Sequence, residues 1–231
     1  METIRVCVFD AYGTLFDVSA AARALAERPE HPRFAAAWGQ VAADWRLKQL
    51  QYSWLRAVTG DHCDFWQVTQ DGLDWALARA GLKETPDLRR ELLDLYWRLG
   101  AYPEVPDLLA RLKAAGHATA ILSNGSPAML AAAVESAGLG AALDAVISVE
   151  EVGVFKPARA VYDLVGARFS CAPSEVLFVS ANGWDAAAAS AYGFRTLWVD
   201  RMGEPVDRLP GTPHHVAPDL TGLTDLLETS P

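Results

Sequence analysis

The stretch that decides the fold is residues 4–16, IRVCVFDAYGTLF. Residues 4–9 are mostly apolar and rich in β-branched side chains, which is typical of a strand buried on both faces of a parallel sheet. The run ends at Asp10, and a turn that contains a glycine follows. Ligands bind at the carboxyl ends of strands in open α/β sheets, so Asp10 is a candidate catalytic acid. For an isolated Asp-x-x-Gly, an Asp that caps its own turn is the simpler alternative.

Length and composition indicate one substantial core with room for a smaller second lobe. The chain has 231 residues, of which 51% are hydrophobic, and a formal net charge of −9. This acidic balance opposes general binding to nucleic acid or to an anionic membrane. No run approaches the ~20 apolar residues of a membrane helix and no signal-type segment is visible, which predicts a cytoplasmic protein. Cys7, Cys63 and Cys171 lack metal-ligand spacing and are expected to be free thiols.

Between the first strand and residue 101 the sequence has helical periodicity only. Apolar residues recur at helical spacing in residues 38–45, 65–80 and 88–99. Six of the eight tryptophans lie here, either as the core of a small helical bundle or as a surface that closes over a ligand. The predicted organisation is an α/β catalytic domain of residues 1–16 and 101–231 with an inserted helical cap domain of residues 17–100.

After residue 103, helices and strands alternate. Ser126 is the expected N-cap of one helix, and Pro127 is its first residue. This alternation with short connections predicts a Rossmann-like, doubly wound parallel sheet with helices on both faces. The tail, residues 203–218, is rich in Pro and Gly and indicates no chemistry, and a last helix is expected at 223–228. The other expected strands are residues 117–122, 145–149, 176–179 and 196–199, and the other expected helices are 105–115, 127–137, 159–169 and 184–192.

Polar residues follow the ends of several predicted strands. Because the carboxyl ends of parallel strands meet at one edge of the sheet, we expect these residues to form one site. They are Asp10 after the first strand, Ser123 and Asn124 after the second, Ser180, Asn182 and Asp185 after a later one, and Lys156 in a loop before a helix.

These motifs resemble those of the haloacid dehalogenase superfamily. Residues 10–14 (DAYGT) are similar to its nucleophile motif, 123–125 (SNG) to its second, Lys156-Pro157 to its third, and Asn182 with Asp185 to its fourth. Three longer runs are similar to the (S)-2-haloacid dehalogenases: residues 9–18 (FDAYGTLFDV), 45–56 (WRLKQLQYSWLR) and 121–127 (ILSNGSP). The resemblance covers essentially the whole chain and implies that the helical insertion is a cap over the sheet.

The residues themselves oppose phosphate-ester hydrolysis, the commonest activity of this superfamily. Such a phosphatase needs a second acid two residues after the nucleophile to protonate the leaving alkoxide, and this position is Tyr12. It also needs Mg²⁺, for which Ser180 and Asn182 before a single acid are poor ligands. A halide leaves without a proton or a metal, so we expect a metal-independent enzyme without a cofactor. A Mg-dependent phosphatase and a non-catalytic binding module on the same fold remain the alternatives.

The resemblance implies a two-step hydrolysis of small (S)-2-haloalkanoic acids to (R)-2-hydroxyalkanoic acids through an ester on Asp10. Lys156 would favour the ionised nucleophile, and Asp185 would orient or deprotonate the hydrolytic water. Thr14, Ser180 and Asn182 would hold the carboxylates. The plainer alternatives are a surface lysine at position 156 and a solvated acid in the first turn of a helix at position 185.

The resemblance also implies the substrate contacts and a homodimer. Arg46 would receive the departing halide with Asn124 beside it, since a diffuse guanidinium suits a large soft anion. On its own, Arg46 would be a cation on a helix surface, and each apolar pocket position would be ordinary core. The carboxylate would be bound by Ser123, Lys156 and backbone N–H groups near Ala11 and Tyr12, and the apolar pocket would be lined by Tyr12, Leu50, Phe65, Tyr162 and Trp184.

Two positions depart from the family pattern. Leu47 stands where family members often have a polar glutamine, and residues 181–183 read Ala-Asn-Gly in place of the more usual Ser-Asn-Ala. The first change makes the mouth of the pocket more apolar and would alter which substrates are accepted. The second is expected to affect only loop packing.

Overall fold

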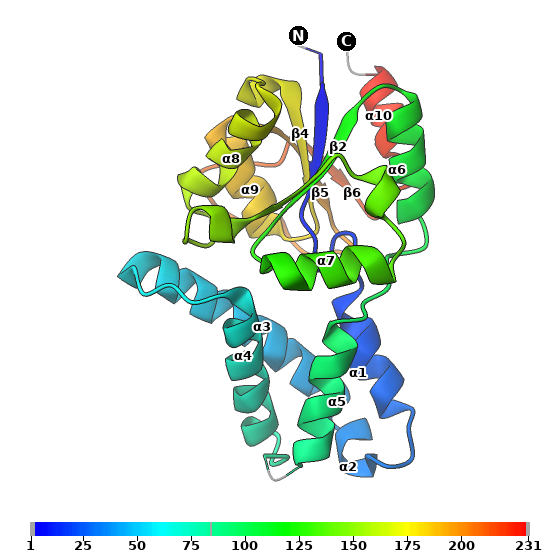
Figure 1. Cartoon of the computed structure of the whole chain (residues 1–231), viewed down its shortest axis with the longest axis vertical. Coiled ribbons are helices and arrows are strands. Elements are labelled where there is room, and N and C mark those ends of the chain that lie inside the picture. Colours follow the sequence, from blue (N-terminus) through cyan, green and yellow to red (C-terminus); the bar gives the residue numbers. More distant parts are fainter. Residues whose placement is uncertain (1–2, 84, 230–231) are drawn as a thin grey trace.

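The computed structural model describes residues 3–83 and 85–229, and one sheet of six parallel strands forms the middle of its upper part (Figure 1). The strand order is β3-β2-β1-β4-β5-β6, with parallel pairing between all neighbours. β1 is buried along its whole length between β2 and β4, so the next residue, Asp10, lies at the centre of the carboxyl edge. The strands are β1 (Val6–Phe9), β2 (Ala118–Ser123), β3 (Ala145–Ser148), β4 (Val176–Ser180), β5 (Arg195–Val199) and β6 (His215–Ala217).

Helices cover both sides of this sheet, as predicted. In Figure 1, α8 and α9 lie on one side of the strands, and α6 and α10 lie on the other. Ser126 stands at the N-cap of α7, but its side chain makes no capping hydrogen bond. The helices are α6 (Val105–Ala114), α7 (Pro127–Ser136), α8 (Arg159–Phe169), α9 (Gly183–Tyr192) and α10 (Leu223–Thr229). The predicted class, a doubly wound α/β sheet with inserted helices, is confirmed.

The edge strand β6 lies inside the tail for which the sequence predicted no strand. It has three residues, and its central Val216 is 52% exposed. A short, half-exposed edge strand has no buried apolar run, so its sequence carries little of the periodicity that reveals a central strand.

In the described residues between β1 and α6 there are five helices, and they gather beyond the carboxyl edge of the sheet (Figure 1). Asp17 and Asp64 begin two of them as N-caps, each accepting hydrogen bonds from backbone N–H groups of the first turn. Gly60 ends α3 with a φ of 73°, a left-handed conformation that glycine adopts without strain. The helices are α1 (Val18–Ala26), α2 (Pro32–Ala35), α3 (Trp38–Thr59), α4 (Phe65–Arg79) and α5 (Pro86–Tyr96).

Most tryptophans of these helices pack within the helical part itself. Trp45 is 4% exposed and donates a hydrogen bond from Nε1 to the Thr69 carbonyl, 2.8 Å away. The rings of Trp66 and Trp97 are 4.8 Å apart, and Trp75 lies 4.2 Å below the Lys48 ammonium. Within the described residues, no helix is both long enough and apolar enough to span a bilayer.

Candidate active site

The Asp10 carboxylate lies at the centre of a cluster of side-chain donors. Its Oδ1 is 3.2 Å from the Lys156 Nζ, and its Oδ2 accepts hydrogen bonds of 3.0 Å from both Thr14 Oγ1 and Asn182 Nδ2. Asp10 is 7% exposed. These partners come from different loops of the carboxyl edge, so Asp10 does not simply cap its own turn. Charge-assisted hydrogen bonds from three directions fix the orientation of the carboxylate.

Lys156 is buried and bridges two acids. Its Nζ lies 2.8 Å from Asp185 Oδ2 in addition to Asp10, its side chain is 1% exposed, and the ring of Phe178 lies 4.9 Å below it. Burial by itself lowers the pKa of Lys156, but the charges of Asp185 and Asp10 outweigh burial and raise the pKa. The ammonium is therefore protonated at neutral pH, and Lys156 is not the surface lysine of the alternative interpretation.

Asp185 lies in the first turn of α9 but is fully buried, which excludes the solvated acid of the alternative interpretation. Its Oδ1 accepts a hydrogen bond of 2.7 Å from the Tyr162 hydroxyl, and its Oδ2 accepts one of 3.3 Å from Ser180 Oγ. Burial raises the pKa of Asp185; the Lys156 charge lowers it, the Asp10 charge raises it, and the net direction is upward. A carboxylate with a raised pKa is a better proton acceptor than an ordinary one.

Tyr162 contacts Asp185 and not the open side of the site. It is 1% exposed, and its ring packs edge-on against Phe178 and Phe194 at 6.0 Å and 5.9 Å. The sequence placed it among the substrate contacts, and the geometry instead makes it a residue that positions Asp185. Nothing in the apolar character of a tyrosine shows where its hydroxyl will point.

The loop after β4 is tied to the loop after β1. Thr14 Oγ1 accepts a hydrogen bond of 2.8 Å from the Ala181 backbone N–H, and Ser180 Oγ accepts one of 3.1 Å from the Asn182 backbone. Ala181 thus takes part through its main chain.

Arg46 crosses from α3 to the sheet. Its Nη2 donates to Asn182 Oδ1 at 2.8 Å and lies 3.4 Å from the Tyr12 carbonyl oxygen. Since Asn182 also donates to Asp10, one amide connects the guanidinium with the acid. Arg46 is therefore not a free cation on a helix surface.

Asn124 and Ser123 have backbone partners, and the sequence did not predict these contacts. Asn124 Oδ1 accepts a hydrogen bond of 2.9 Å from the Lys156 backbone N–H, and Ser123 Oγ accepts one of 3.1 Å from the Gly125 backbone. The hydrogen bonds of Arg46 go to Asn182 and Tyr12, and the expectation that Asn124 lies beside Arg46 at the departing halide stays a prediction. Both side chains lie at the carboxyl edge beside the lysine.

Aromatic rings close one side of the site. The ring of Tyr12 stacks on Tyr96 at 5.5 Å and lies 5.9 Å from Phe65, which is 3% exposed. Burial raises the pKa of Tyr12 well above its ordinary value, and the neighbouring Tyr96 and Asp10 raise it further. A Cβ on Gly125 would stand 2.8 Å from the Tyr12 ring, so a glycine is needed there. Ala11 is completely buried, whereas Leu50 and Trp184 are half-buried.

Sequence reasoning missed two residues that support the site. Arg201 follows β5, donates from Nη2 to the Thr14 carbonyl at 3.1 Å, and lies 3.7 Å over the ring of Tyr102. Tyr96, the last residue of α5, stacks on Tyr12. Neither belongs to a motif, and only the tertiary fold brings them to the nucleophile loop.

Chemically, the cluster is an oriented carboxylate, a buried ammonium and a second buried carboxylate. No group of three or more His, Cys, Asp or Glu side chains in the described parts of the chain could hold a metal ion. The two acids of the site, Asp10 and Asp185, already share the Lys156 ammonium. Such a set suits nucleophilic attack by one carboxylate and proton acceptance by the other.

Comparison with known proteins agrees with this geometry. Residues 4–193 match the family profile of the haloacid dehalogenase-like hydrolases. The chain belongs to this family. Curated relatives within it include (S)-2-haloacid dehalogenases: "(S)-2-haloacid dehalogenase 1" of Pseudomonas sp. (strain CBS-3) is 44% identical, over 98% of both chains. The resemblance read from the motifs is confirmed.

Solved structures of dehalogenases are also similar to this chain. A dehalogenase crystal structure has a TM-score of 0.92 and 36% identity over 100% of both chains. The L-2-haloacid dehalogenase from Xanthobacter autotrophicus with chloropropionic acid covalently bound has a TM-score of 0.88 and 36% identity, over 99% of this chain and 100% of that one.

Proposed function

We propose that the protein is a hydrolytic dehalogenase that converts (S)-2-haloalkanoic acids to (R)-2-hydroxyalkanoic acids and halide without a metal. The observation that carries this proposal is the Lys156 ammonium between the carboxylates of Asp10 and Asp185. The names of the relatives support it, as does the chloropropionic acid covalently bound to the Xanthobacter autotrophicus enzyme.

In the first step, the Asp10 carboxylate attacks the carbon that bears the halogen. A C–O bond forms on the side opposite the halogen, and the C–X bond breaks with its electron pair leaving on the halide. The product is an ester of Asp10 with inverted configuration at C2. Thr14, Asn182 and Lys156 hold the attacking group in one orientation, which reduces the entropic part of the barrier.

In the second step, water attacks the ester carbonyl carbon of Asp10. Asp185 accepts one proton of the water and returns it to the leaving alkoxide oxygen as the bond between that oxygen and the carbonyl carbon breaks. The 2-hydroxy acid leaves with its new oxygen taken from Asp10, and the other proton of the water goes to solvent. Tyr162 and Ser180 orient Asp185 for this role. The oxygen of the water remains in the regenerated carboxylate.

We assign the substrate contacts as follows. Arg46 receives the departing halide, with Asn124 beside it. The hydrogen bond from Arg46 to Asn182 supports this assignment, because Asn182 itself donates to the nucleophile Asp10. Ser123, Lys156 and the backbone N–H groups near Ala11 and Tyr12 bind the carboxylate of the substrate. Tyr12, Leu50, Phe65 and Trp184 surround the carbon chain.

A Mg²⁺-dependent phosphatase of the same family is a weaker candidate. The position that must donate a proton to an alkoxide holds Tyr12, whose raised pKa makes it a poor acid. The position that would supply a further acidic ligand holds Asn182, which already donates to Asp10.

The test is halide release from (S)- and (R)-2-chloropropionate with and without EDTA. We expect release from the (S) enantiomer alone, the same rate in EDTA, and no release by Asp10→Asn. With excess enzyme in water labelled with heavy oxygen, the first turnover should give an unlabelled hydroxyl group. EDTA-sensitive release of phosphate from a phosphate ester, with no halide release, would refute the proposal.

We also propose that residues 17–100 act as a cap domain and that the chain works in the cytoplasm as a homodimer. The cap assignment is supported by Arg46, and by His62 Nε2, which lies 3.0 Å from Glu150 Oε2 across the two parts. The three cysteines are free thiols, as a reducing compartment permits. The dimer is supported by large apolar side chains exposed on α3, among them Leu47 and Leu55.

A further inference from the structure

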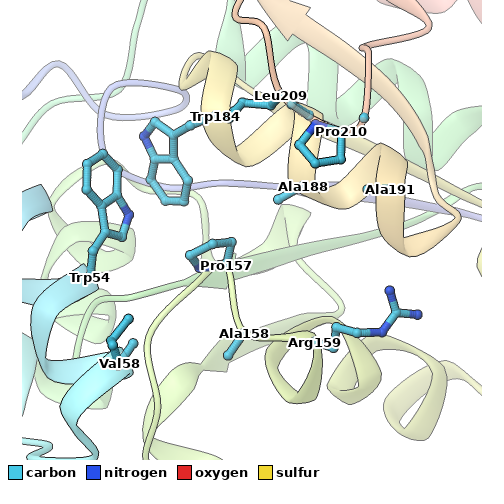
Figure 2. Close-up of a pocket in the computed structure, with 13 residues that line it drawn as sticks. Trp54, Val58, Pro157, Ala158, Arg159, Trp184, Ala188, Ala191, Leu209 and Pro210 are labelled. Carbon is cyan, nitrogen blue, oxygen red and sulfur yellow. The ribbon is translucent and has the colours of Figure 1, made fainter.

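An apolar pocket lies between the helical part and the sheet part (Figure 2). It has a volume of about 640 Å³, within the range of small-molecule pockets. Its walls come from the end of α3, the start of α8, one side of α9 and the loop at 209–211. Among the residues that line it are Trp54, Val58, Pro157, Trp184, Ala191 and Leu209.

The lining is apolar, which defines what this pocket can hold. Among its described lining residues, Arg159 alone carries a charge. The guanidinium of Arg159 lies 4.8 Å over the ring of Tyr192, so it is already engaged at one border. A pocket of this composition favours an aliphatic group over a polar or charged one.

One side of α3 leads from the proposed reaction site to the pocket. On α3, Arg46, Leu50, Trp54 and Val58 recur every four residues and therefore follow one side of the helix. Arg46 binds Asn182 at one end of this row, and Trp54 and Val58 line the pocket at the other.

Two residues of the pocket are sequence neighbours of the acid–lysine cluster. They are Trp184, next to Asp185, and Pro157, next to Lys156. The rings of Trp54 and Trp184 meet edge-on, 5.4 Å apart with an angle of 85° between their planes. This tryptophan pair lines the pocket where α3 meets α9.

The pair has unused hydrogen-bonding groups. The Nε1 atoms of Trp54 and Trp184 are both buried without a hydrogen-bond partner. Figure 2 shows the nitrogen of each ring on the side turned to the other ring. A buried donor without a partner is unfavourable, so the contact between the two rings is less stable than the apolar area it buries would suggest. Separation of the rings would expose both N–H groups to water.

We propose that the pocket receives the alkyl chain of long 2-haloalkanoic acids and that the tryptophan pair is the passage to it. This assignment rests on the proposed function and specifies its substrate class. The carboxylate and C2 stay at Asp10, while the chain passes Leu50 and the two indoles. Each methylene that leaves water in this way should raise kcat/KM by up to about fourfold until the pocket is full.

The first experiment compares kcat/KM for (S)-2-chloropropionate and (S)-2-chlorooctanoate. Ala191→Trp and Val58→Trp fill the pocket from opposite walls, and Ala167→Trp is the control on an exposed helical position outside it. We expect both filling variants to lower the octanoate value about tenfold or more and to leave the propionate value within about twofold. Equal losses on both substrates, or a wild-type value that falls steadily with chain length, would overturn the proposal.

The second experiment uses unreactive n-octanoate and does not depend on catalysis. Wild type should bind octanoate more tightly than propionate, with a change in tryptophan fluorescence, and Ala191→Trp should weaken octanoate binding alone. If no 2-haloacid releases halide but this pattern holds, the proposed function fails and the pocket assignment stands. If halide is released and Ala191→Trp binds octanoate like wild type, the pocket assignment fails alone.

Discussion

Lys156 is the residue on which the charges of the site depend. It is the cation placed between Asp10 and Asp185, and all three side chains are nearly or fully buried. Burial of two carboxylates is tolerable only because the ammonium lies between them. The same arrangement serves catalysis, because one acid must stay charged to attack and the other must be able to accept a proton.

Replacing Lys156 by methionine should destabilise the fold, because the carboxylates of Asp10 and Asp185 would lose the ammonium between them. The volume is nearly kept, so the loss comes from unpaired buried charge and should be about 3–5 kcal/mol in the free energy of unfolding. The measurement is urea unfolding at neutral pH. In the double variant with Asp185→Asn, one charge is removed and stability should partly return; a double variant no more stable than Lys156→Met would contradict this account.

Tyr162 sets the pH range in which Asp185 can work. Its hydrogen bond stabilises the ionised carboxylate, so in Tyr162→Phe the pKa of Asp185, already raised by burial, should rise further. Protonated Asp185 cannot accept a proton from water, and the acid limb of kcat should move to higher pH by about one unit. Tyr192→Phe, which removes a surface hydrogen bond to Asp163, is the matched control. An unchanged acid limb would exclude this role.

At the residue scale the sequence leads to the two acids, the lysine and three hydrogen-bond partners of the acids, Thr14, Ser180 and Asn182. Asp10, Lys156 and Asp185 follow strands or precede a helix, so topology alone brings them together. Arg201 and the hydroxyl of Tyr162 reach the site through side-chain directions that no spacing encodes. The hydrogen bond of Asn124 with the Lys156 backbone was not evident from the sequence for the same reason.

Among the elements, α3 has the widest influence on the site. It packs against α4, where Gly72 lets the two helices approach until a Cβ would be 3.3 Å from Trp45 Cδ1. The same helix sends Arg46 to the sheet and Trp54 to the apolar pocket. Its helical periodicity was evident from sequence, whereas β6 was not, because a three-residue edge strand buries too little to leave a pattern.

Gly211 lets the loop at 209–211 lie against α9, and this loop forms one wall of the apolar pocket. A Cβ at this position would overlap the Ala187 carbonyl oxygen and lie 2.7 Å from the Ala191 nitrogen. Gly211→Ala should therefore lower the free energy of unfolding by about 1–3 kcal/mol. Gly39→Ala is the control, because it lies in α3 with nothing within 4 Å of the added Cβ and should be neutral or stabilising. Equal stability of the two variants in thermal unfolding would show that the loop moves aside freely.

Over the whole molecule, the site exists only where the inserted helices meet the sheet. Asp10, Lys156 and Asp185 belong to the sheet part, and the Arg46 hydrogen bond to Asn182 joins the helices to them. The sequence predicted both parts and their order in the chain, but not the aromatic contact of Trp54 with Trp184 that lies between them. Such contacts depend on how the helical part is placed against the sheet part, and local periodicity gives no information about that placement.

The proposed homodimer would form through the exposed apolar side of α3. Leu55 is 61% exposed on α3 and stands nine residues after Arg46, two and a half turns on, so it faces away from the site. A partner that covers this side would remove apolar surface from water without blocking the site. Sedimentation should give about twice the chain mass of 25.0 kDa, and Leu55→Glu should shift the molecule toward the single chain.

Val206→Glu, at an apolar residue 48% exposed in the tail, is the control and should leave the mass unchanged. A wild-type protein that sediments as one chain would contradict the dimer, and a dimer unaffected by Leu55→Glu would place the interface away from this side of α3.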